Sequence, residues 1–155
     1  MHLLALPSPL TAQSAKPESF AECDQLAARQ PESEETTRCY DEVGETLQQP
    51  EETAARFRQL IAAHPGTPWP SLFLGILEVS KDRKRAEELF RTAAQGFVTR
   101  KDIGGEVVAR ANLHRMLFNA GRIDEAAAQA ELALKAAEAA GQSEFIARAN
   151  ILKAR

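Results

Sequence analysis

Long apolar segments and β-strand patterns are both missing from this chain of 155 residues. No stretch is long enough to cross a membrane as a helix, which takes about 20 apolar residues. Alternating runs of β-branched residues are absent, and so are the hairpin turns Asn-Gly and Asp-Gly. Helical periodicity instead extends over nearly the whole sequence. The sequence therefore predicts an all-α fold without membrane insertion.

Patterns typical of catalysis or ligand binding are also absent. The three histidines, His2, His64 and His114, are spread apart, and neither later one has a cysteine or carboxylate at the helical spacing of metal ligands. The pair Gly104-Gly105 lacks the rest of a phosphate-binding loop. We therefore expect no enzymatic activity, no catalytic residue, no cofactor and no metal.

Charge is unevenly distributed along the chain, although the net charge is only −3. Residues 18–55 hold eleven acidic and two basic residues, whereas residues 56–110 hold ten basic and six acidic residues. Solvated helix faces explain such runs most simply; the alternative is an array whose acidic end and basic middle orient a charged partner. The basic cluster Lys81–Arg85 is interpreted as a solvated turn and not as a phosphate-binding patch, so no nucleic-acid partner is expected.

The chain has two cysteines, Cys23 and Cys39, and Pro31 lies midway between them. Ser19 and Glu22 have the spacing of a capping box that begins a helix. Pro31 is expected to end this helix and to be the first residue of the next one. Two antiparallel helices folding about Pro31 would bring the cysteines face to face, so a disulfide is expected; two buried free thiols are the alternative.

The first 17 residues have two interpretations. The apolar run Leu3–Leu6 is followed by prolines and small residues, as in the second half of a secretory signal. No Lys or Arg precedes this run, and it is shorter than the apolar region of about 7–15 residues in such signals. Residues 1–17 are thus a truncated signal peptide or a disordered tail. Together with the expected disulfide, this slightly favours an exported protein, periplasmic or extracellular, over a cytoplasmic one.

One segment of the chain occurs twice. Ala-Arg-Ala-Asn-Leu at 109–113 returns thirty-eight residues later as Ala-Arg-Ala-Asn-Ile at 147–151, and a weaker copy is Leu74-Gly75. A fixed spacing in this range is typical of helical repeat arrays, in which each unit buries its apolar face against its neighbours. We expect residues 18–48 to form a helical hairpin with the cysteine pair. Residues 49–155 are expected to form repeats, with the last helix a cap or a truncated repeat.

Prolines, glycines and capping residues predict where the helices begin and end. A glycine-containing link is expected at residues 101–105, and Gly121 is expected to form the turn of a hairpin. The expected helices are 18–29, 31–48, 50 to about 64, 68 or 70 to about 80, 83–100, 106–119, 124–140 and one from 143 to the end.

The pattern of small and large apolar residues resembles the tetratricopeptide repeat (TPR). In that family the first helix carries a Leu-Gly pair, and the second carries a small residue, an aromatic four later and a small residue three later. Leu74-Gly75 followed by Ala86, Phe90 and Ala93 fits this pattern. Departures are His114 in place of a glycine and a period nearer forty than thirty-four residues, which resembles the longer-period subclass. The resemblance implies a right-handed superhelical array of antiparallel helix hairpins, a TPR-like α-solenoid.

The family resemblance implies that the protein is a scaffold that binds a protein or peptide partner in a groove lined by the first helix of each pair. By the repeat register, the expected groove residues are Trp69, Leu72, Ile76, Asn112, Arg115, Phe118, Asn150 and Lys153. A cysteine-containing hairpin before such repeats is also similar to the N-terminal part of bacterial proteins with TPR and a caspase-like CHAT protease domain. That resemblance implies an alternative role, a regulatory or self-associating oligomerisation arm of a larger protein.

Four of these groove residues also have a simpler explanation. The amides of Asn112 and Asn150 can pair with a peptide backbone, or they can bond to the adjacent helical turn. Arg115 and Lys153 could hold an acidic group of the partner. Trp69 and the phenylalanine at 118 could instead belong to the core.

Overall fold

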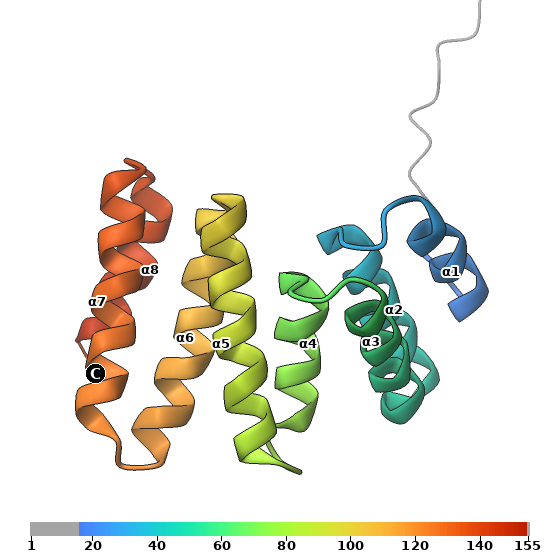
Figure 1. Ribbon diagram of the computed structural model, residues 1–155, viewed down its shortest axis with the longest axis horizontal. Helices are drawn as coiled ribbons and strands as arrows, with labels where there is room; N and C mark the ends of the chain where they lie inside the picture. Colours follow the sequence, from blue (N-terminus) through green and yellow to red (C-terminus); the bar gives the residue numbers. More distant parts are fainter. Residues whose placement is uncertain (1–15, 155) are drawn as a thin grey trace, which may run out of the picture.

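The computed structural model describes residues 16–154, which form eight helices and no strand (Figure 1). The predicted all-α fold is thereby confirmed. The predicted tail or signal peptide lies almost wholly outside the described residues. No helix of the described part is long and apolar enough to cross a membrane. The helices are α1 (Phe20–Arg29), α2 (Glu34–Leu47), α3 (Pro50–Ala63), α4 (Pro68–Glu78), α5 (Arg83–Arg100), α6 (Ile103–Asn119), α7 (Ile123–Ala139) and α8 (Ser143–Lys153).

The helices follow one another through space in the order of the sequence (Figure 1). Each helix packs against the next one along the chain, and the backbones of α2, α4, α6 and α8 also contact one another in that order. Among residues 16–154 no helix backbone contacts another that is more than two helices away. The structure is therefore an open row with two layers, one of even-numbered and one of odd-numbered helices.

Most predicted helix ends are confirmed, and their causes are visible. Pro50 is the first residue of α3, where its missing N–H costs no hydrogen bond. The side chain of Asp82 accepts a hydrogen bond from the backbone N–H of Arg85 and begins α5 where expected. Gly121 and Gly141 have positive φ angles of 75° and 65° in the turns after α6 and α7.

Two predicted boundaries are wrong. Pro31 does not begin α2, because Ser33 accepts the N–H of Thr36 and caps the helix at Glu34. The predicted link at residues 101–105 is wrong for residues 103–105, because α6 begins at Ile103 and includes both glycines. A Cβ at Gly105 would lie 2.3 Å from the ring of Phe97. The glycine pair is therefore explained by close helix packing.

Burial shows the structural period of the repeats. Four inward positions of α5 are completely buried, and the positions forty residues later in α7 are buried as well: Ala86, Phe90, Ala93 and Phe97, then Ala126, Ala130, Ala133 and Ala137. A spacing of forty residues thus holds between α5 and α7, whereas the buried Thr53, Phe57 and Leu60 of α3 lie thirty-three residues before Ala86, Phe90 and Ala93. In α7 alanines replace both phenylalanines, so α7 can approach its neighbours more closely than α5 does.

The packing of α2 against α3 as a repeat-like pair was not recognised from the sequence. Val43 of α2 is buried beside the residues of α3, and a Cβ at Gly44 would overlap the side chain of Thr53. Gly75 of α4 makes the same close approach to Phe90 of α5. Helix α2 therefore belongs with α3 as well as with α1, and the Val43-Gly44 pair is the counterpart of Leu74-Gly75.

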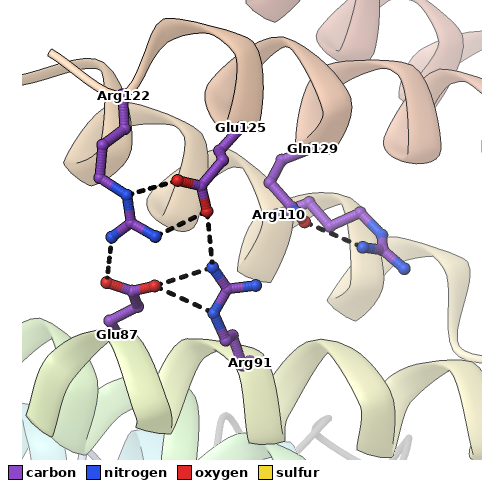
Figure 2. A network of polar contacts seen from close by, with 6 residues as sticks. All are labelled: Glu87, Arg91, Arg110, Arg122, Glu125 and Gln129. Carbon is purple, nitrogen blue, oxygen red and sulfur yellow. Dashed lines mark hydrogen bonds and ion pairs between the residues drawn. The ribbon is translucent and has the colours of Figure 1, made fainter. Parts of the chain in front are cut away.

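Charged side chains join α5 to α7 in the layer of odd-numbered helices (Figure 2). Glu87 lies between Arg91 and Arg122, with N–O distances of 2.7 Å to each, and Glu125 lies between the same two arginines. Arg122 lowers the pKa of Glu87, and Arg91 adds to this shift. The four alternating charges close a ring, which fixes the start of α7 against α5 more firmly than an isolated surface pair would.

Helix α1 is attached to the rest of the protein by a disulfide and a polar network. The Sγ atoms of Cys23 and Cys39 lie at a bonded distance of 2.06 Å, which confirms the predicted bridge. The hydroxyl of Tyr40 donates to Asp24 of α1 at 2.8 Å, and Arg56 of α3 forms an ion pair with the same carboxylate. Burial and the adjacent Asp24 raise the pKa of Tyr40.

Candidate functional site

The candidate site is the face formed by the even-numbered helices α2, α4, α6 and α8, which we call the even-helix face. These helices alternate with oppositely directed partners, so all four have their N-terminal ends at the same edge. On each helix, residues three or four apart in sequence lie on the same side. Side chains from four separate parts of the chain are thereby collected on one surface.

A cleft of about 490 Å³ lies at the N-terminal ends of these helices. Every even-numbered helix contributes to it, together with the link before α6. The lining includes Glu34 of α2, Trp69 of α4, Gly104 and Val108 of α6, and Phe145 and Arg148 of α8. The cleft thus exists only because the four helices are packed side by side.

Aromatic and charged groups are combined in this cleft. Trp69 is half-buried and packs edge-on against Phe97, with ring centroids 4.7 Å apart. The ring of Phe145 packs against Gly104. A Cβ atom on this glycine would lie 2.8 Å from the ring. The guanidinium of Arg148 lies 5.9 Å from the centroid of Phe145 and pairs with Glu144 at 3.0 Å. The cleft can therefore accept an apolar side chain whose neighbours meet charged groups at the rim.

At the opposite end of the even-helix face two large apolar side chains are exposed. Ile76 of α4 is 44% exposed and Phe118 of α6 is 41% exposed. Ile76 lies two turns after Trp69, and Arg115 lies two turns after Val108, so both belong to the stripe that lines the cleft. Beyond the cleft, this side of the face thus presents the apolar side chain of Ile76 and the charged side chain of Arg115.

Most predicted groove residues are exposed or half-buried, but one is not. Trp69, Ile76, Arg115 and Phe118 have accessible side chains. Leu72 is only 1% exposed and packs into the core between α4, α5 and α6. A partner cannot touch it, so its assignment to the groove is corrected. The reason is that Leu72 belongs to the buried cluster that α4 shares with α5 and α6.

Asn112 and Asn150 do not lie in equivalent places. Asn112 is half-buried. Its side-chain amide donates to the carbonyl of Val108 at 3.0 Å and accepts from Arg115 at 2.9 Å. Asn112 therefore bonds to the adjacent helical turn, which was the alternative to binding a peptide backbone. Asn150 is exposed on α8. Leu113 is buried, whereas its counterpart in the sequence repeat, Ile151, is 58% exposed.

The sequence repeat of thirty-eight residues is therefore not the packing repeat. At a spacing of forty only Ala109 and Ala149 are both buried, because Ala147 and Lys153 are exposed where Val107 and Leu113 are buried. The remaining predicted residue, Lys153, is exposed and lies 3.9 Å from Glu131 of α7. Asn150 and Lys153 are thus at the outer end of the row, separate from the cleft.

Several residues of this face were missed by the sequence reasoning, above all the acidic side chains of α2. Asp41 and Glu45 line a small depression together with Leu77 of α4. Their spacing places them on the same side of α2 as Glu34 of the cleft. The only signal available was the excess of acidic residues at 18–55, which did not show toward which helix they face.

Asp41 is a half-buried carboxylate with like charges beside it. Burial, and to a lesser extent Glu45 and Glu42, raise the pKa of Asp41 to about 6 against the opposing effect of Arg38. No hydrogen bond or ion pair to Asp41 is present among residues 16–154. The ionised form of this side chain is therefore destabilising in the folded protein.

Replacing Asp41 by asparagine is expected to stabilise the protein at pH 7.5 but not at pH 4. The folded pKa lies above the unfolded one, so the penalty is complete above about pH 6 and disappears below about pH 4. Because the side chain is half exposed, we expect a gain of only about 1 kcal/mol. Urea denaturation at the two pH values measures it. The exposed Glu35 of the same helix is the control, since Glu35→Gln should change stability by less than about 0.5 kcal/mol; an equal gain for both variants would contradict the assignment.

No three histidine, cysteine, aspartate or glutamate side chains within residues 16–154 are grouped so that they could hold a metal ion. Comparison with known proteins gives no family model that matches this chain and no similar sequence among the curated proteins. The likeness to the tetratricopeptide repeat accordingly rests on the residue pattern alone.

Proposed function

We propose that this protein is a non-catalytic binding module that holds a short peptide segment of another protein on its even-helix face. One observation carries the proposal. Side chains between Glu34 and Arg148, from all four even-numbered helices, converge on one cleft with aromatic walls. Aromatic and arginine side chains in a desolvated pocket are the groups that contribute most to protein recognition.

The same packing supports a TPR-like α-solenoid. The backbones of the even-numbered helices contact one another, whereas those of the odd-numbered helices do not, and α5 and α7 are joined by long charged side chains (Figure 2). A row of helices curves toward the layer in which the helices lie closer together. The even-helix face is therefore the concave side of the row. Close approaches at Gly44 and Gly75 within successive pairs give the row its repeat.

A peptide fits this face better than a compact small molecule does. The cleft is open, and exposed apolar side chains continue from it to Ile76 and Phe118. Small-molecule sites usually enclose most of their ligand. An extended or helical segment can instead place one side chain in the cleft and others along the face.

Selection of peptides from a displayed random library tests the proposal. Peptides selected on the wild-type protein should bind the variant Val108→Glu at least tenfold more weakly, because the new carboxylate fills the apolar side of the cleft. Val98 is the matched control, since it is a partly exposed valine on α5, in the other layer. Peptides that bind wild type, Val108→Glu and Val98→Glu with equal affinity would place the binding surface elsewhere.

A further inference from the structure

We infer that the bound segment is bipolar, with a basic end over α2, apolar side chains over α4 and an acidic end over α6. This inference rests on the proposed function and adds the chemistry of the partner. It comes from five residues on the even-helix face, Asp41, Glu45, Ile76, Arg115 and Phe118, which we call the bipolar strip.

The acidic end of the strip has charges that the protein itself leaves unpaired. Asp41 and Glu45 lie one turn apart on α2, and neither forms an ion pair within residues 16–154. The nearby cation Arg38 is engaged by Glu34, one turn earlier on the same helix. Leu77 of α4 and the start of α3 complete the depression beside both carboxylates without adding a basic group. A cation from outside the chain would therefore relieve the repulsion between them.

Apolar side chains occupy the middle of the strip on α4 and also lie beside the basic group on α6. Ile76 presents nearly half of its surface to solvent from α4. Phe118 does the same from α6, where its ring stacks on that of His114 with centroids 6.0 Å apart. Exposed aliphatic and aromatic side chains that follow each other on one face are suited to apolar side chains of a partner.

The other end of the strip is basic. Arg115 is exposed, and its guanidinium donates to the neutral amide of Asn112 at 2.9 Å but to no carboxylate within residues 16–154. Other arginines of the protein, such as Arg110 and Arg122, are paired with glutamates. Arg115 thus retains donors for an acidic side chain of the partner.

The order of these charges determines the arrangement of the partner. Helices α2, α4 and α6 succeed one another in the row, so acidic, apolar and basic groups follow in that order (Figure 1). Two helix spacings of about 8–10 Å give a length of about 18 Å. An extended peptide covers this length with about six residues. The part of the ligand that lies on the bipolar strip is therefore about six residues long, with opposite charges at its two ends.

Two synthetic peptides of identical composition test the inference. One has the sequence Lys-Lys-Leu-Phe-Leu-Glu-Glu, and the other, Lys-Glu-Leu-Phe-Leu-Lys-Glu, mixes the charges. The segregated peptide should bind about tenfold more tightly at low salt, and the difference should decrease at 0.5 M salt. Asp41→Asn and Arg115→Gln should each reduce the difference about threefold, as expected for exposed ion pairs. The control Glu42→Gln, on the side of α2 that faces α1, should leave it unchanged.

A nitroxide label on the lysine end of the segregated peptide supplies a second measurement. It should broaden amide resonances of α2, and a label on the glutamate end should broaden those of α6. Equal affinity of the two peptides, or labels that broaden the same helices from either end, would overturn the bipolar arrangement while leaving the peptide-binding proposal intact. Failure of both peptides to bind at millimolar concentration would also overturn it. The library selection described above then decides separately whether the face binds peptides at all.

Discussion

Replacing Phe90 by alanine is expected to cost the protein about 3–5 kcal/mol of stability, the usual loss when a large buried aromatic is truncated. Phe90 is completely buried in the cluster of apolar residues that joins α4, α5, α6 and α7. Its ring occupies the space left by Gly75, where a Cβ would lie 2.7 Å from the ring. Because a small protein has only about 5–15 kcal/mol of stability, urea denaturation should show a large shift of the midpoint.

A double-mutant cycle separates this contact from a general loss of packing. Gly75→Ala alone should destabilise, since the new methyl group overlaps the Phe90 ring. In the Phe90→Ala background the same methyl group enters the cavity, so it should be neutral or stabilising. Phe118→Ala is the matched control, because this phenylalanine is on the surface and should cost less than about 1 kcal/mol. Additive effects of Gly75→Ala and Phe90→Ala would contradict the proposed contact.

Local signals in the sequence were sufficient to predict most helices but not to predict which helices pack against one another. The bounds of α5 follow from the cap at Asp82 and from helical periodicity, and the structure confirms both ends. The start of α6 was missed because Gly104-Gly105 suggested a link, although Asp102 gives the same local signal as Asp82: its side chain accepts the N–H of Gly105 at 2.9 Å and caps the helix. What the sequence does not show is why two glycines follow this cap. The rings of Phe97 and Phe145, from other helices, occupy the space beside them.

The candidate site was predicted in part for a similar reason. The repeat register identified Trp69, Ile76, Arg115 and Phe118, because their positions depend only on the periodicity of α4 and α6. The acidic contribution of α2 was missed because the cysteines suggested that α2 pairs with α1 alone. The contact of Gly44 with Thr53, which joins α2 to the repeat row, is visible only in the three-dimensional structure.

Loss of the Cys23–Cys39 bridge is the second change with a large expected effect. The bond closes a loop with a sequence separation of 16, and the chain-entropy model gives about 3 kcal/mol for such a loop. Reduction with dithiothreitol, or the double variant Cys23→Ala/Cys39→Ala, should therefore lower the unfolding midpoint substantially. The effect should be largest for α1, whose backbone contacts only α2.

Hydrogen exchange should show where the stability is lost. Amides of α1 should lose protection after reduction, while those of α5 and α6, in the next cluster of the core, should remain protected. Asp24→Asn is the comparison variant, since it keeps the disulfide but removes the ion pair with Arg56. It should cost less than the loss of the bridge, because the carboxylate is partly exposed. If reduction left the exchange of α1 unchanged, then packing of Phe20 and Leu26 against the α2–α3 core would hold α1 in place, and the disulfide would be dispensable for the folded state.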